Sequence, residues 1–378
     1  MSTLTLNGLR GDNPLAYMAA VGALVVADRI LGAQGRVRLG WSHAFGKWRP
    51  TLRTNVELSE SEFLSLLHRG LHRKPPTGAT EDLHRADQEL KNAKKALKDA
   101  TKDFKDEAKR RNLKKGTERD ALAEELVRPA QRRAEEALAE RTAIAEAGAS
   151  PDETTALGQH LKVPLSAFAC FVKKAAQKAS ADDRRTADFA AAFGSELIAE
   201  SSGNLQPTRF GKTNGAGSKN MLLDMAILMR EMSIERLAAS LFHDWDYADK
   251  TRSLGWDPAD ARPYALLATN PDKGAFTMHG ANLLAYEALV LFTTAVQARQ
   301  LHTIGTSQQN KHHFFTWPIW TPMIGTSVLR SLLALRALQT EAPDRDALRA
   351  MGIEEVFRAE HFHFTDKKFL RFRPARAV

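Results

Sequence analysis

The sequence has a single cysteine and few aromatic residues. Cys170, alone among 378 residues, excludes an intramolecular disulfide and any multi-cysteine zinc or iron–sulfur site. The N-terminal segment has no basic stretch followed by an apolar core, and we expect the apolar runs to be too short for a membrane span. These features predict a cytoplasmic protein with neither a signal peptide nor a membrane partner. The chain is long enough to bury at least one full core.

Positive charge exceeds negative charge. Lysine and arginine number 54 against 45 acidic residues, which gives a formal net charge of +9. A basic soluble protein attracts phosphate-rich partners, because each phosphate that a cation neutralises releases a condensed counterion. The composition therefore makes nucleic acid a candidate partner.

Helix formers dominate the sequence, and we predict an α+β fold that is predominantly helical. Residues 1–78 are expected to form a small α/β unit, residues 79–149 a long antiparallel helical hairpin inserted between the flanking regions, and residues 150–378 a mainly helical region.

In the first unit, Asn13 is the expected cap of a helix beginning at Pro14, and Ser59 with Glu62 forms a capping box. Helices are predicted over residues 165–178, 184–199, 219–232, 234–242, 282–297 and 327–338, and strands over residues 3–6, 37–41 and 362–372.

The hairpin prediction depends on seven-residue repeats of apolar residues. Leu83, Leu90, Leu97 and Phe104 form one repeat, and Ala123, Ala130, Ala137 and Ile144 form the other. Gly116 is expected to end the first helix, and Pro129 to bend the second. Residues 85–115 carry 12 basic and 6 acidic side chains. This surplus favours a solvated coiled-coil face or an arm that contacts a nucleic-acid backbone, and the sequence leaves both interpretations open.

A glycine-rich basic loop spans residues 209–220 and leads into a helix. Backbone donors and a helix N-terminus would face the same space there, which is typical of an anion-binding site. The loop lacks the glycine spacing of a Walker motif, so nucleic-acid phosphates are the favoured ligand. The predicted contacts are Arg209, Lys212, Thr213, Asn214, Ser218, Lys219 and Asn220.

Two tracts interleave aromatic and basic residues. The first, residues 41–53, adds Lys47, Arg49 and Arg53 to the predicted nucleic-acid contacts, because rings can stack on unpaired bases while cations hold phosphates. The second tract, residues 308–320, contains the mostly apolar segment Trp317-Pro318-Ile319-Trp320. Core packing is the favoured interpretation of that segment.

Catalytic patterns are weak in this sequence. His243 and Asp244 could ligate a metal ion, but the sequence shows no companion ligands at metal-site spacing. Cys170 is expected to be a buried, inert thiol on an apolar helix face, and no Gly-x-Ser-x-Gly motif is present. We therefore predict no catalytic residue, no metal site and no cofactor, and expect the protein not to be an enzyme.

Several short segments resemble the large-subunit family of type I CRISPR (Cascade) surveillance complexes, especially its I-U or I-G branch. They are residues 13–24 (NPLAYMAAVGAL), followed by 27–30 (ADRI) and 39–41 (LGW), and residues 255–266 (GWDPADARPYAL), 280–289 (GANLLAYEAL) and 315–320 (FTWPIW). The resemblance implies a non-catalytic subunit of an antiviral complex that binds crRNA and target double-stranded DNA. It also implies recognition of the protospacer-adjacent motif (PAM), contacts with the other subunits of the complex, and recruitment of a helicase-nuclease.

Two other functions remain open from the residues alone. The hairpin could make the protein a coiled-coil adaptor without direct nucleic-acid readout. Alternatively, His243 and Asp244 could serve a metal-dependent nuclease.

Overall fold

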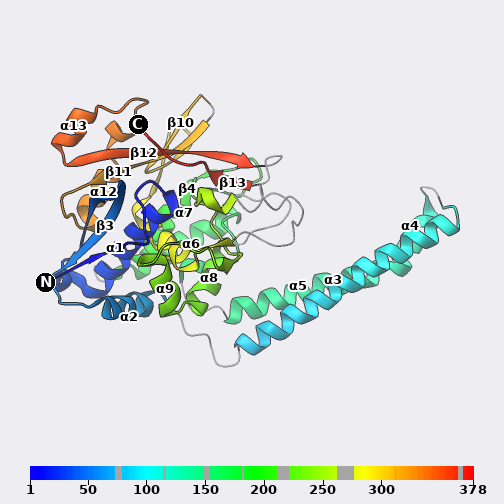
Figure 1. Cartoon of the computed structure of the whole chain (residues 1–378). Helices are drawn as coiled ribbons and strands as arrows, with labels where there is room; N and C mark the ends of the chain where they lie inside the picture. The colour runs from blue at the N-terminus through cyan, green and yellow to red at the C-terminus, as the bar shows by residue number, and fades with distance from the viewer. Residues whose placement is uncertain are drawn as a thin grey trace. The chain divides into compact units, whose positions relative to one another are not determined.

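The computed structural model describes residues 1–72, 79–113, 116–148, 153–180, 183–211, 221–261, 276–310, 312–364 and 369–378. These residues form two compact units (Figure 1). One comprises Met1–His72 together with Glu153–Val378, and the other is Arg73–Asp152. The N-terminal and C-terminal regions therefore share one unit, whereas the sequence suggested separate parts.

The prediction of a predominantly helical fold was wrong. In the described part of the chain the fold is mixed, with 51% helix, 22% strand and several small sheets. The main error concerns the C-terminal region. Residues expected to be mainly helical there include a five-stranded antiparallel sheet, whose strands β10 (Thr306–Gln309), β11 (His312–Trp320), β12 (Ile353–Phe364) and β13 (Phe369–Phe372) are neighbours in that order, with β14 (Arg376–Ala377) paired to β12.

The first unit is centred on helix α1 (Pro14–Gly35), whose first 14 residues are all buried. Asn13 caps this helix, since its side-chain oxygen accepts from the Ala16 N–H at 3.1 Å, as predicted. Helix α11 (His279–Ala288) packs against α1, and helix α2 (Glu60–Leu71) covers part of it. The predicted capping box of α2 is confirmed, because Ser59 and Glu62 exchange side-chain and backbone hydrogen bonds.

Helix α1 is the one helix in the described residues that is long and apolar enough to span a membrane. Asp28 and Arg29 interrupt its apolar run after Ala27, so the helix qualifies by overall length and composition although the uninterrupted run is shorter. In its most apolar window, 72% of the residues are buried inside the protein. Such burial is typical of a central core helix, which can be apolar on all sides.

Further short elements complete the first unit. The helices are α6 (Leu165–Lys178), α7 (Arg185–Phe193), α8 (Met221–Glu231), α9 (Ile234–Leu241), α12 (Thr326–Leu333) and α13 (Arg345–Ala350), with 3-10 turns at Glu153–Thr155, Pro258–Ala261, Leu289–Leu291 and Arg336–Gln339. Two-stranded sheets are formed by β4 (Gly194–Ala199) with β5 (Leu205–Pro207), β6 (Asp249–Lys250) with β7 (Phe276–Thr277), and β8 (Thr294–Gln297) with β9 (Gln300–Thr303).

Two predicted helices end early and continue as strands. The helix expected over residues 184–199 ends at Phe193, and residues 194–199 form β4. The helix expected over residues 282–297 ends at Ala288, and β8 follows after a 3-10 turn. In both segments pairing with a later strand prevails over local helix propensity, because propensity is only a weak determinant when tertiary partners are available.

The second unit consists of helices α3 (Ala79–Arg110), α4 (Thr117–Leu126) and α5 (Arg128–Gly148), with α3 packed along α4 and α5. The buried positions include Ala86, Leu90, Leu122 and Ala134. Helix α4 ends just before Pro129, in agreement with the predicted bend, because a proline inside a helix lacks one backbone donor and clashes with the preceding turn.

Candidate nucleic-acid interface

The β2–β3 hairpin presents one apolar face to the core and carries basic side chains on the other face, where residues 321–323 cover Gly40. Strands β2 (Arg38–Ala44) and β3 (Lys47–Thr54) pair antiparallel, and β1 (Ser2–Thr5) pairs with the other edge of β3. Side chains alternate between the two faces of a strand, so buried Leu39 and Leu52 lie opposite each other on the inner face. The outer face carries Arg38, Arg53 and Lys47, and all three side chains are exposed. We call these three residues the Arg38–Arg53 face.

Arg38 and Arg53 are direct cross-strand partners. Residues in this relationship have Cβ atoms about 4.5–5.5 Å apart, and like charges there destabilise the sheet. In the described part of the chain neither side chain has an ion-pair or hydrogen-bond partner, and the same holds for Lys47. The fold thus places two positive charges side by side without compensation, which leaves them available to an external anion.

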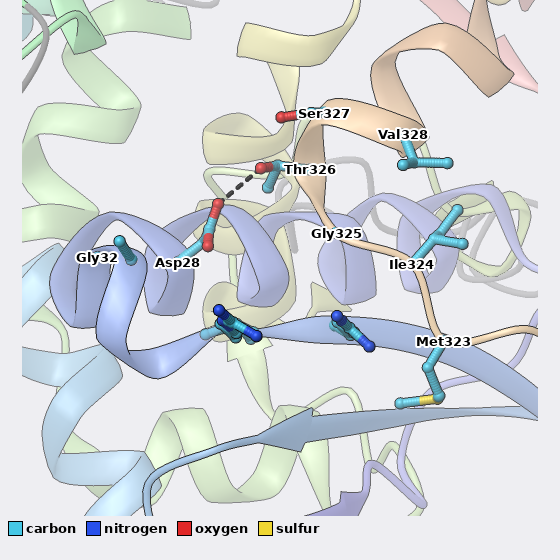
Figure 2. A pocket seen from close by; sticks show the side chains of 12 residues that line it. Asp28, Gly32, Met323, Ile324, Gly325, Thr326, Ser327 and Val328 are labelled. Atoms are coloured by element: carbon cyan, nitrogen blue, oxygen red, sulfur yellow. Dashed lines mark hydrogen bonds between the residues drawn. The ribbon is translucent and has the colours of Figure 1, made fainter.

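An open cleft of about 770 Å³ adjoins the Arg38 end of this face. Figure 2 shows the side chains that line it, from the end of α1, the start of β2 and the first turn of α12. Arg36 and Arg38 contribute the basic side chains, and Asp28 the acidic one. Asp28 accepts a 2.6 Å hydrogen bond from the Thr326 hydroxyl. The N-cap of α12, Gly325, has no side chain that could cap the first turn of the helix.

Phe45 occupies the tip of the β2–β3 hairpin. Its backbone φ of 50° and the φ of 71° at Gly46 give the two central residues of the turn the left-handed conformation that two-residue hairpins favour. The Phe45 side chain is fully exposed, at 103% of its reference area. A bulky residue is rare at positive φ. The turn thus holds an aromatic ring in solvent, seven residues along the chain from Arg38 and eight from Arg53.

The Arg49 side chain is hydrogen-bonded within the protein. Its Nη1 donates to the carbonyl oxygens of Asn7 and of Leu9, the latter at 2.9 Å. The guanidinium therefore anchors the loop that leads from β1 to α1. Of the three cations predicted in this tract, Lys47 and Arg53 remain available to a ligand, and Arg49 is already engaged.

The glycine-rich loop contributes only its first residues to the described structure. Arg209 has an exposed side chain, and its backbone N–H donates to the Thr303 hydroxyl at 3.3 Å. Phe210 is buried and packs edge-on against the rings of Phe292 and Phe315. The other predicted contacts, Lys212, Thr213, Asn214, Ser218, Lys219 and Asn220, lie outside the described residues.

Three tryptophans of the two tracts, Trp41, Trp317 and Trp320, belong to the core, whereas Phe45 is exposed. The interpretation of Trp317 and Trp320 as packing residues is confirmed, since both are buried and their indole N–H groups donate to the carbonyls of Gly11 and Leu39 at 2.8 and 2.9 Å. Trp41, from the first tract, is also buried and stacks on Tyr17 with ring centroids 5.7 Å apart. Trp41 is therefore not accessible to a base.

Comparison with protein-family models, with curated proteins and with solved structures found no match.

Asn13 and Asp257, from two of the segments that carry the CRISPR large-subunit resemblance, are in contact in the first unit. The Asn13 amide donates to the Asp257 carboxylate at 2.9 Å. Asp257 is buried and also accepts from the Tyr247 hydroxyl at 3.0 Å and from the Ala259 N–H at 2.9 Å. These residues stabilise the junction of α1 with the loop after β6.

The remaining candidates for metal or thiol chemistry are His243, Asp244 and Cys170. No cluster of three or more His, Cys, Asp or Glu able to hold a metal ion occurs among the described residues, which include His243 and Asp244. The prediction that Cys170 is buried was wrong, because its side chain is exposed. Phe168 and Phe171 occupy the buried face of α6, and Cys170, two residues after Phe168, projects from the other side.

Arg36 and Arg38 were not among the predicted contacts. Arg38 lies inside the strand predicted over residues 37–41, but its pairing with Arg53 depends on a second strand, β3, that the sequence did not lead us to predict. The alternation of Arg49, Thr51 and Arg53 is the signal that could have revealed this strand.

Proposed function

We propose that this protein is a non-catalytic, nucleic-acid-binding subunit of a type I CRISPR RNA-guided surveillance complex, and that it binds the nucleic-acid backbone through the Arg38–Arg53 face. The observation that carries the proposal is the uncompensated cross-strand pair of Arg38 and Arg53. A like-charged pair of this kind opposes folding locally. A phosphate bound between the two guanidinium groups would remove the repulsion, and arginine matches phosphate geometry particularly well.

The surroundings of the pair support a polyanion rather than a single small anion. Arg36 extends the basic surface into the adjoining cleft, whose acidic residue, Asp28, is bonded to Thr326 of α12, and Lys47 extends it toward the hairpin tip. From Arg53 to Lys47 the strand rises about 20 Å. This length spans several phosphates of one nucleic-acid strand.

Phe45 gives the same surface a group that can contact bases. Aromatic rings stack on unpaired bases of any sequence, and each such contact contributes about 1–3 kcal/mol. In an RNA-guided complex the target duplex is opened beside the motif that the protein reads. Phe45 is positioned to stack on a base exposed by that opening, while Arg38 and Arg53 hold the backbone.

The finer roles follow from the resemblance described above. They are binding of crRNA and target DNA, recognition of the protospacer-adjacent motif, and recruitment of the helicase-nuclease in the cytoplasm. Backbone contacts by Arg38 and Arg53 fix position and orientation but do not read sequence. We therefore assign the motif-reading role to other residues, for which the loop of residues 209–220 remains the candidate.

Co-expression with the other subunits of such a complex and a crRNA tests this proposal. The wild-type chain should co-purify with the complex, and the complex should bind a matching target duplex. The double variant Arg38→Gln/Arg53→Gln should still assemble but bind the target about 10- to 100-fold more weakly, because two phosphate contacts are lost. A matched control, Lys162→Gln/Arg299→Gln, removes two exposed charges elsewhere and should leave binding unchanged. Failure of the wild-type chain to co-purify would contradict membership of the complex.

A further inference from the structure

We infer that helix α3 carries a second nucleic-acid-binding surface, a stripe of lysines that contacts the backbone of a DNA duplex without reading its sequence. The inference rests on the proposed function, because it assumes that the protein binds nucleic acid. It concerns a second surface, on helix α3 of the unit Arg73–Asp152, whereas the Arg38–Arg53 face belongs to the other unit. The stripe consists of Lys91, Lys95, Lys98, Lys102, Lys105 and Lys109.

These lysines lie on one face of the helix. Their spacing alternates between four and three residues, and an α-helix turns about 100° per residue, so all six fall within about 40° of one line along the helix. The 18-residue interval from Lys91 to Lys109 corresponds to about 27 Å at 1.5 Å per residue. The stripe is thus a straight row of six positive charges.

The lysines of the stripe form no ion pair within the described residues. All six are exposed, and none has an ion-pair or hydrogen-bond partner there. Asp99 and Asp106 are exposed beside the row, about one helical turn from Lys95, Lys102 and Lys109, but neither is paired with a lysine of the stripe. Glu107 is bonded to Arg110 and Arg111 at 2.7 and 2.6 Å. The row therefore keeps a surplus of positive charge for a partner.

The apolar side of α3 is already occupied. Leu90 and Ala108 are buried in the hairpin, and the Arg119 guanidinium lies 5.6 Å from the centre of the Phe104 ring. No apolar residue belongs to the lysine stripe itself. A third coiled-coil helix needs an apolar seam, and membrane-surface binding needs an exposed apolar face. The stripe offers neither, which favours a purely ionic partner.

The chemistry and length of the stripe fit a DNA duplex backbone. Lysine is a compact point charge on a flexible stem, without the planar fork that arginine uses for bidentate recognition of guanine. Such contacts add affinity without base selection. Over about 27 Å, a duplex advances about eight base pairs at 3.4 Å per pair and carries about 16 phosphates, so a straight row laid along the duplex lies close to backbone phosphates on both sides of a groove. The hairpin then acts as an arm that holds flanking duplex.

The test measures binding of the full-length protein to a mixed-sequence duplex of about 30 base pairs across about 50–200 mM salt. Lys98→Gln/Lys102→Gln should weaken binding about tenfold and lower the slope of log K against log salt by about 1.8, because each phosphate contact contributes about 0.9. Glutamine has nearly the helix propensity of lysine, so α3 should persist, and unchanged helical circular dichroism would verify this. The matched control, Arg132→Gln/Arg133→Gln, removes two exposed charges from α5 and should behave as the wild type.

The outcomes separate the two surfaces. An unchanged slope in Lys98→Gln/Lys102→Gln, with a reduced slope in Arg38→Gln/Arg53→Gln, would overturn the lysine stripe and leave the proposed function intact. A reduced slope in both variants supports both surfaces. If Arg132→Gln/Arg133→Gln loses as much affinity and slope as Lys98→Gln/Lys102→Gln, the effect is one of net charge and the inference is overturned. An absence of duplex binding by the wild type would also overturn it.

Discussion

The Glu287 carboxylate and the Arg29 guanidinium form a buried ion pair, with Oε2 and Nη1 2.7 Å apart. Arg185 donates to the second oxygen of Glu287 at 2.5 Å, and Glu287 itself is fully buried. The three residues come from α1, α7 and α11, so one carboxylate joins three helices. Burial alone would raise the pKa of Glu287, but the two guanidinium groups outweigh it and lower the pKa to about 2.

Removing this carboxylate should destabilise the first unit strongly. Glu287→Gln leaves two partly buried arginines without their counter-charge, and breaking a buried pair from one side costs about 3–5 kcal/mol. Urea denaturation of the variant and the wild type measures the loss. The exposed Glu196→Gln serves as control and should change the free energy of unfolding by less than about 0.5 kcal/mol. An equally small effect of Glu287→Gln would contradict the role assigned to the ion pair.

The same residue should give the protein an acid-sensitive stability. The folded pKa of Glu287, about 2, lies below its ordinary value of 4.5. A depressed folded pKa stabilises the protein above the unfolded pKa, and the contribution, about 3 kcal/mol, is lost as the pH falls from about 4.5 toward 2. The difference in unfolding free energy between the wild type and Glu287→Gln should shrink over this interval. A difference that stays constant from pH 6 to about pH 2 would contradict the shifted pKa.

The contact between α1 and α11 should depend on Gly22. A Cβ atom at this position would lie 1.7 Å from the Leu284 carbonyl oxygen, which is backbone and cannot move aside alone. Gly22→Ala should therefore cost about 3 kcal/mol or more, at the upper end of overpacking effects. At Gly325 the nearest atom to an added Cβ is 3.6 Å away, so Gly325→Ala is a suitable control. Equal thermal midpoints for Gly22→Ala and Gly325→Ala would contradict the prediction, because α1 and α11 would then accommodate the added methyl group without cost.

Cys170 should react with thiol reagents in the native protein. Its side chain is exposed on α6, opposite the buried Phe168 and Phe171. We expect one equivalent of an aromatic disulfide reagent to react without denaturant, and Cys170→Ser to abolish the reaction with little change in stability. A thiol that reacts only after unfolding would place Cys170 inside the core.

Local signals in the sequence predicted local structure well. The Asn13 cap and the Ser59–Glu62 capping box involve residues three apart in the chain, and both are confirmed. The boundaries of α6, Leu165–Lys178, were also predicted correctly. In each case the interactions that start or end the helix join residues close in the sequence, so the local sequence pattern is enough to predict them.

The candidate site depends on long-range pairing, which the sequence reasoning did not resolve. Arg38 and Arg53 are 15 positions apart, and they become neighbours only through the register of β2 with β3. Strand β11 is buried along Phe315–Trp320 and so lacks the alternation of a half-exposed strand. A short apolar run without alternation gives no clear signal of helix or strand, which explains why the five-stranded sheet was not predicted.

The salt dependence of nucleic-acid binding by the purified protein tests the central claim most directly. The slope of log K against log salt counts the phosphates that the protein neutralises. For Arg38→Gln/Arg53→Gln we predict a slope smaller than that of the wild type by about 1.8, with the Lys162→Gln/Arg299→Gln control unchanged. A wild-type protein that binds with the same slope and affinity as Arg38→Gln/Arg53→Gln would contradict the assignment of the Arg38–Arg53 face as a nucleic-acid interface.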